Sequence, residues 1–94
     1  MPKIFLTGYI DVPEARRALA HDALPQHIAL TRAEPGCLRF DVTEDETSPG
    51  RYLVSELFDS RVDFDAHQMR AAQSPWAAVT AGIPRHYTIE EVSA

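Results

Sequence analysis

The stretch from Tyr52 to Trp76 constrains the fold most, because in it a buried strand passes directly into a helix. Residues 52–58 are short, largely apolar and rich in aromatics, with Glu56 as their only charge, which predicts a strand. Ser60, followed three residues later by Asp63, resembles a capping box and predicts the start of a helix. A strand that turns at residues 59–60 into a helix is therefore expected here.

The predicted helix after Ser60 places Phe64 and His67 on one face, because residues three apart are neighbours on a helix surface. Ser74-Pro75 predicts a break and a restart, with serine as the cap and proline at the first helical position. The face that carries His67 is the first place to expect a reactive site.

The rest of the chain supplies three more strands and one more helix. Strands are predicted at residues 3–12, 37–43 and 85–90, and a helix at residues 14 to about 34. Pro25 predicts a kink or a restart within that helix. The helix is expected to bury the stripe Leu19, Ala23, Ile28 and Leu30, and the strand at 37–43 to alternate with Leu38, Phe40 and Val42 on one side. Residues 92–94 are expected to be a loose tail.

The order β-α-β-β-α-β is typical of a ferredoxin-like α+β fold, with a four-stranded antiparallel sheet and two helices on one face. In the first strand Ile4, Leu6, Gly8 and Ile10 fall on one side, and Phe5, Thr7 and Tyr9 on the other. Both sides are largely apolar or aromatic, so both should be covered. A homodimer that buries the face opposite the helices is therefore expected.

Chain length, net charge and cysteine count limit the class of protein. Ninety-four residues make a single domain, 1–94, and a net charge of −5 without a Lys or Arg cluster argues against a nucleic-acid partner. One cysteine, Cys37, excludes an internal disulfide and favours a reducing compartment. No leader or long apolar span is evident, so a cytoplasmic protein without membrane contact is expected.

With this pattern assembled, the chain resembles the antibiotic biosynthesis monooxygenase family of dimeric α/β barrels. The resemblance covers nearly the whole chain and rests on residues 23–42, which contain Glu-Pro-Gly-Cys, on residues 55–58, and on Asp-Phe-Asp-Ala-His-Gln at 63–68. It implies a homodimer with a cavity in each subunit between sheet and helices. Members include cofactor-independent oxygenases of quinol-like polyketides, quinol monooxygenases, an isomerase and haem-degrading enzymes. The haem-degrading members use an asparagine on the first strand with a tryptophan and a histidine on the second helix. This triad is not reproduced here, because Gly8 stands at the asparagine position and His67 lies near the tryptophan position.

The quinol monooxygenase-like group is the nearest match, and its chemistry needs a base, an anion-binding group and a dry pocket. His67 suits the base because its ordinary pKa is near working pH. Arg70 or Arg85 could hold the anion. Trp76, Phe64 and Tyr52 are expected to form walls for an aromatic ring. His27 is expected as a second histidine on the same cavity.

Structural roles compete with these functional ones. His67 and His27 are alternatively satisfied polar groups in the core, and Trp76 is alternatively a core residue. Glu56 is expected in a salt bridge that could cross the dimer. Inert packing is expected for Cys37, and the four histidines share no metal-ligand spacing, so neither a metal nor another cofactor is expected.

Three functions follow. The first is cofactor-independent monooxygenation of a small quinol or polyphenolic aromatic, with His67 as base. The second is a non-catalytic module that shelters a small apolar ligand in the same cavity. The third is an isomerase in which His67 moves a proton.

Overall fold

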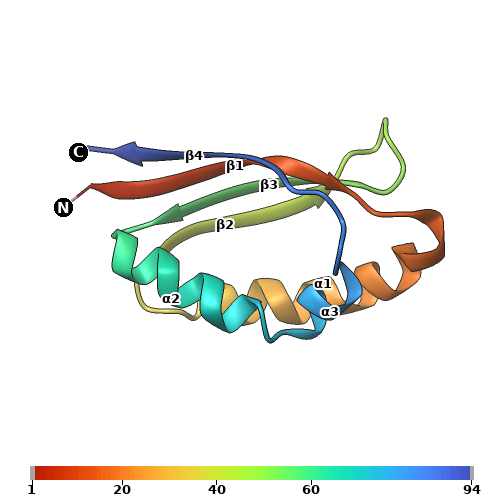
Figure 1. The fold of residues 1–94 in the computed structure, drawn as a ribbon, viewed down its shortest axis with the longest axis horizontal. Helices are drawn as coiled ribbons and strands as arrows, with labels where there is room; N and C mark the ends of the chain where they lie inside the picture. The colour runs from red at the N-terminus through yellow and green to blue at the C-terminus, as the bar shows by residue number, and fades with distance from the viewer. Residues whose placement is uncertain (1, 94) are drawn as a thin grey trace.

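The computed structural model describes residues 2–93 as a sheet layer and a helix layer (Figure 1). The strands follow the order β2-β3-β1-β4, and every neighbouring pair is antiparallel. The ferredoxin-like α+β fold is thus confirmed. The elements are β1 Lys3–Asp11, a 3-10 turn Glu14–Arg16, α1 Arg17–Arg32, β2 Cys37–Glu44, β3 Arg51–Phe58, α2 Arg61–Ala71, α3 Pro75–Val79 and β4 His86–Val92.

The core lies between the sheet and the helices, because alternate residues of β1, β2 and β3 point at the helix layer. Glu56 falls in this alternation on β3, so a carboxyl group is buried in register with apolar neighbours. The strand side chains of the core are Ile4, Leu6, Ile10, Phe40, Val42, Tyr52, Val54 and Phe58.

The predicted alternation of buried and exposed side chains in β2 fails at the start of the strand. A register shift between Cys37 and Arg39 leaves Leu38 unpaired and 51% exposed, while Phe40 and Val42 are buried as expected. An extra residue in one strand of a pair moves the preceding side chains out of phase. A bulge of this kind leaves no mark in the hydrophobic pattern.

The predicted stripe of α1 is half right: Ala23 and Ile28 pack against the core, whereas Leu19 and Leu30 are exposed. The buried positions are Ala20, His27 and Thr31, which recur at helical spacing on the face toward the sheet. The helix also runs unbroken through Pro25 instead of restarting. Pro25 lies on the exposed side, where water can bond the carbonyl that proline leaves without a donor.

The capping predictions for the helices after β3 are confirmed. The Ser60 and Ser74 side chains accept hydrogen bonds from the backbone N–H groups of Asp63 and Ala77, each at 3.2 Å. These caps begin α2 and the short α3. The prediction of a loose tail is wrong at Val92, which pairs with Lys3 as the last residue of β4; Ala94 lies outside the described residues.

Gly8 is required by close packing against β4. Its backbone faces Tyr87, its partner in the sheet, and a Cβ at this position would overlap the carbonyl oxygen of His86 and lie 2.8 Å from the Tyr87 side chain. An aromatic ring over a cross-strand glycine is a known stabilising pair. Gly8 thus sets the distance between β1 and the Tyr87 ring, which lines the cavity described below.

We expect Gly8→Ala to lower the free energy of unfolding by about 2–3 kcal/mol, because an added methyl group must push β1 and β4 apart. Gly82→Ala is the matched control. Gly82 has a φ of 77° but no atom within 4 Å of an added Cβ, so only backbone strain of about 1 kcal/mol applies there. Urea unfolding measures both, and equal losses at the two positions would contradict the packing argument.

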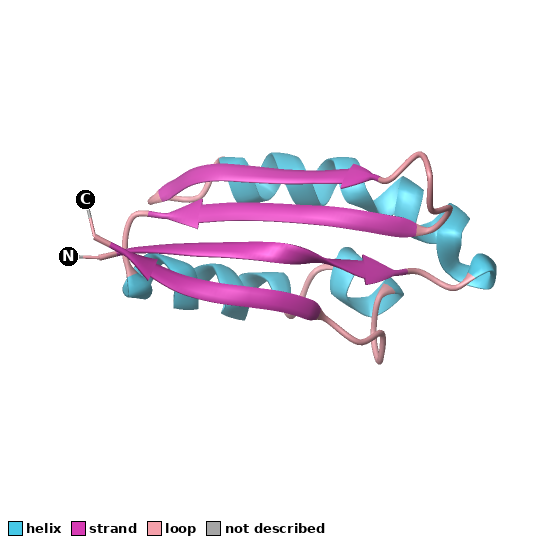
Figure 2. Ribbon diagram, turned by 90° about the horizontal axis from the view of Figure 1, so that it is seen from above, coloured by secondary structure: helices cyan, strands magenta, loops and turns pink. Residues whose placement is uncertain are grey.

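The sheet face away from the helices is open in the described chain (Figure 2). Tyr9 stacks on His86 there, with ring centroids 4.6 Å apart, and the Arg51 guanidinium lies 4.0 Å from the Tyr9 ring centre. Leu53, the cross-strand partner of Tyr9, is 43% exposed on the same face. Separately, none of the helices within residues 2–93 is both long and apolar enough to cross a bilayer.

Candidate functional site

A cavity of about 320 Å³ lies between the sheet and the helices. Three buried polar side chains reach it from three different elements: His27 from α1, Glu56 from β3 and His67 from α2. The remaining walls mix apolar and polar side chains: Ala71, Ala72, Trp76 and Ala77, with Gln68, Arg85 and Tyr87. A cavity with apolar walls and a few converging polar groups is the usual form of a small-molecule site.

His67 is held in one orientation by Glu34, which follows α1. Its Nδ1 lies 2.7 Å from Oε1 of Glu34, and its ring stacks on Phe58 with centroids 4.9 Å apart. A carboxylate oxygen only accepts, so Nδ1 carries the hydrogen and donates to Glu34. The other ring nitrogen, Nε2, is therefore left with its lone pair as a proton acceptor.

Glu34 is in turn fixed by Arg70. The Arg70 Nε donates to Oε2 of Glu34 at 3.0 Å, and its terminal nitrogen donates to the Thr31 hydroxyl at 2.7 Å. The Thr31 hydroxyl donates to the His27 carbonyl oxygen at 2.7 Å. A hydrogen-bonded chain thus joins α2 to α1 and positions the imidazole of His67.

The pKa of His67 is lowered by burial, against which the hydrogen bond to Glu34 acts in the opposite direction. His67 is only 3% exposed, so charging its ring inside the protein is unfavourable without nearby carboxylates. Glu34 supplies one such carboxylate on Nδ1. An imidazole of this kind is neutral at neutral pH and ready to accept a proton.

Glu56 lies on the other side of the His67 ring. Its Oε1 is 3.7 Å from Nε2 of His67 and has no hydrogen-bond partner among the described residues. This contact becomes the salt bridge expected for Glu56 only when the His67 imidazole is protonated. Burial, and secondarily the charge of Glu34, raises the pKa of Glu56 from 4.5 to about 7.

His27 and Trp76 form a stacked pair on the cavity wall, with ring centroids 5.8 Å apart. The Nδ1 of His27 is buried without a hydrogen-bond partner within residues 2–93. Burial, and then the nearby Arg70 charge, lowers the pKa of His27 from 6.5 to about 4, so its ring is neutral. A neutral, unpartnered imidazole beside an aromatic wall can hydrogen-bond a polar ligand atom.

The β4 side of the cavity is less reactive. Burial raises the pKa of Tyr87 to about 12, so its hydroxyl stays neutral. Arg85 donates to the backbone carbonyl of Thr80 at 3.1 Å and to the Thr80 hydroxyl at 2.8 Å. Its guanidinium is thus committed to holding the segment before β4 in place.

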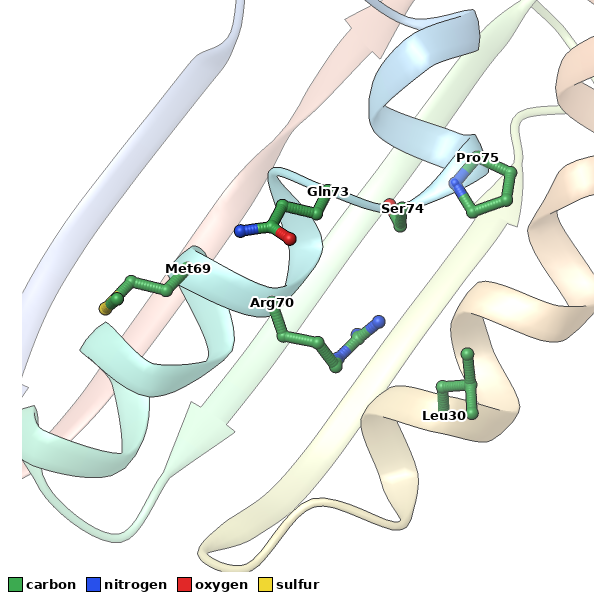
Figure 3. Close-up of a pocket in the computed structure, with 6 residues that line it drawn as sticks. All are labelled: Leu30, Met69, Arg70, Gln73, Ser74 and Pro75. Atoms are coloured by element: carbon green, nitrogen blue, oxygen red, sulfur yellow. The ribbon is translucent and has the colours of Figure 1, made fainter.

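Of the six site residues that the sequence suggested, His67, His27 and Trp76 line the cavity. Phe64 instead packs edge-on against Phe58, and Tyr52 packs edge-on against Trp76 within the core. Arg70 lines a separate, open groove of about 380 Å³ between α1 and α2, where its side chain extends toward Leu30 (Figure 3). The contribution of Arg70 to the cavity is therefore indirect, through Glu34.

Nothing in the sequence indicated the role of Glu34, and for Glu56 a structural salt bridge was favoured over a raised pKa and a catalytic role. Glu34 belongs to the Glu-Pro-Gly turn, where it looked like the end of a helix. A lone acid in an apolar strand was the available signal for Glu56. Separately, within residues 2–93 no three His, Cys, Asp or Glu side chains are grouped so as to hold a metal ion.

Comparison with known proteins gives the family. The sequence model of the family described as antibiotic biosynthesis monooxygenase matches residues 3–78. No curated protein matches the sequence.

Solved structures share the fold. A candidate antibiotic biosynthesis monooxygenase from Nitrosomonas europaea is 24% identical with a TM-score of 0.79, over 96% of this chain and 88% of that one. A second such candidate, from Deinococcus radiodurans, is 23% identical with a TM-score of 0.80, over 97% of this chain and 93% of that one. With a family match over most of its length and this fold, the chain belongs to the antibiotic biosynthesis monooxygenase family.

Proposed function

We propose that this protein is a cofactor-independent monooxygenase that oxidises a small quinol or polyphenolic aromatic, with His67 as the base. The observation that carries the proposal is the buried imidazole whose Nδ1 is fixed by Glu34 and whose Nε2 faces the cavity. Oxygen reacts readily with the anion of an electron-rich aromatic, so removing a hydroxyl proton is the step a protein must assist. A base oriented by a carboxylate supplies that step.

The size and lining of the cavity suit such a substrate. A dry cavity of about 150 Å³ admits benzene, so the roughly 320 Å³ found here has room for one ring with substituents or for two fused rings. Trp76 and the neighbouring alanines supply apolar contact for an aromatic ring. We keep a cytoplasmic site of action and the lack of a cofactor as predictions.

In the proposed reaction, a substrate hydroxyl gives its proton to Nε2 of His67. The charge of the resulting imidazolium is balanced by Glu34 on the opposite nitrogen. The ring anion then reacts with oxygen, and one quinol and one O₂ give one hydroxyquinone and one water. No step requires an external reductant, because the quinol supplies the electrons.

An oxygen electrode with a panel of one- and two-ring quinols tests the proposal. We expect enzyme-dependent oxygen uptake with one O₂ consumed per hydroxyquinone formed and no oxygen released when catalase is added, because uncatalysed oxidation gives peroxide instead. A panel in which ligands bind but no quinol consumes oxygen would favour the non-catalytic binding module. Conversion of a substrate without oxygen would favour the isomerase.

We also propose a homodimer formed through the open sheet face. Leu53 and the Tyr9–His86 stack lie on that face, and apolar surface there is unfavourable in water. Antibiotic biosynthesis monooxygenase family proteins are commonly dimeric. A symmetric pair of sheets would cover both faces at once.

We expect Leu53→Asp to shift the protein toward monomers, because the dimer would bury an unpaired charge. Light scattering at micromolar concentration should give about twice 10.5 kDa for the wild type and a mass near 10.5 kDa for the variant. Val62→Asp, at a 69% exposed position on α2, is the control and should stay dimeric. A wild-type mass near that of one chain would contradict the proposed dimer.

A further inference from the structure

Glu56 has a feature that the proposed reaction does not yet use. Its side chain is over nine-tenths buried, it lines the cavity, and its Oε1 has no hydrogen-bond partner among the described residues. Buried carboxyl oxygens without partners are rare because leaving them unbonded is unfavourable. On a residue that lines a cavity, such an atom gains a partner when a bound molecule shifts the carboxyl group by a small rotation.

The geometry places that partner next to His67. Oε1 of Glu56 and Nε2 of His67 are 3.7 Å apart, too far for a good hydrogen bond with each other. Oε1 is closed to a water-sized group in this structure, so one ligand oxygen can lie within hydrogen-bond distance of both side chains once the Glu56 carboxyl rotates toward the cavity. The two side chains come from β3 and α2, so the fold itself holds this gap open.

We propose that Glu56, in its neutral form, donates a hydrogen bond to the substrate oxygen after that oxygen has given its proton to His67. This inference rests on the proposed function and adds a second oxyanion-stabilising group to the same site. The imidazolium N–H and the carboxylic O–H would then both point at the developing negative charge. Fixed donors aimed at such charge stabilise it.

The surroundings favour the neutral form of Glu56. Burial and the facing Glu34 carboxylate raise its pKa to about 7, so below that pH it can donate. The arginines beside the cavity and beside Glu34 are bonded elsewhere, Arg85 to Thr80 and Arg70 to Glu34. The titratable and charged groups around Glu56, by element, are His27 on α1, Glu34 after it, Cys37 on β2, His67 and Arg70 on α2, Arg85 before β4, and Tyr87 on β4.

Two consequences distinguish this role from a merely structural one. Above about pH 7 an ionised Glu56 would repel an oxyanion, so the site should bind phenolate less well. Glu56→Gln keeps a donor at every pH, because an amide N–H₂ donates without titrating. The variant should therefore bind phenolate without the weakening that the wild type shows above about pH 7.

The test measures binding of 4-nitrophenol, which does not need turnover, to the wild type and to Glu56→Gln. Trp76 is the single tryptophan and lines the cavity, so quenching of its fluorescence reports the Kd. We expect the ratio of wild-type Kd to variant Kd to be constant below about pH 6 and to rise about tenfold per pH unit above 7, reaching about 30-fold near pH 8.5. Taking the ratio removes the titration of the ligand and of His67.

Glu56→Leu supplies a second comparison, since it has no donor at any pH and should bind 4-nitrophenolate about tenfold more weakly than Glu56→Gln throughout. A ratio that stays flat with pH, or tighter wild-type binding at alkaline pH, overturns the inference, as does the absence of quenching near pH 6. Oxygen uptake is not part of this readout. The inference can therefore fail while the monooxygenase proposal stands, and the reverse.

Discussion

Replacing His67 with glutamine is expected to lower the rate of quinol-dependent oxygen uptake by roughly 10²–10⁴-fold. Glutamine can still donate a hydrogen bond to Glu34, but it cannot take up a proton at neutral pH. The expected loss is in kcat, because the missing interaction forms only as the proton moves. Initial rates of oxygen consumption across a range of substrate concentrations measure it.

His21→Gln is the matched control for this substitution. This control makes the same histidine-to-glutamine change at an exposed position of α1, away from the cavity. We expect its rate to equal that of the wild type, with circular dichroism showing intact folds for both variants. If His67→Gln kept the wild-type rate, His67 would be only a satisfied core group and the base would have to be sought elsewhere.

Glu56→Gln is expected to be more stable than the wild type at alkaline pH by about 3 kcal/mol. In the folded chain the pKa of Glu56 is raised from 4.5 to about 7, so the folded state holds the proton more tightly than the unfolded state. The resulting stabilisation is complete below about pH 4.5 and is lost as the pH rises to about 7. At 1.36 kcal/mol per pH unit the total loss is about 3 kcal/mol, and glutamine avoids it.

Thermal or urea unfolding at a series of pH values gives this difference. The advantage of Glu56→Gln should be near zero at about pH 4, grow up to pH 7 and then level off. Comparing the two proteins at each pH cancels other groups, including His27, whose lowered pKa destabilises the fold as pH falls from 6.5 toward about 4. Glu46→Gln in the exposed loop before β3 should change stability little. A pH-independent difference for Glu56→Gln would mean that Glu56 is not buried as described.

The fold could be predicted from the sequence because local signals agreed with one another. The caps at Ser60 and Ser74, and the period of two in β1 and β3, each specified the same order of elements. The errors lie where the local pattern is weak. Leu38 leaves the predicted face because of a bulge, and α1 buries Ala20, His27 and Thr31 while Leu19 and Leu30 are exposed.

The site was only partly predictable, for a physical reason. His67 stood out through its residue type and its place on a helix face, but its partners come from other elements. Glu34 is 33 residues away in the chain and Glu56 is on a neighbouring strand. Contacts of this range depend on how helices pack over the sheet. For the same reason the sequence did not show that Arg70, expected to hold an anion, donates hydrogen bonds to Glu34 and Thr31.

The central claim is that the cavity takes a hydroxyl proton from an aromatic ligand onto His67. The visible absorbance of bound 4-nitrophenol tests this directly, because its ionised form is yellow and its neutral form is not. Near pH 6, we expect the ligand bound to the wild type to be ionised well beyond its fraction in free solution, and the ligand bound to His67→Gln not to be. A colourless ligand on the wild type, or equal colour on both proteins, would contradict it.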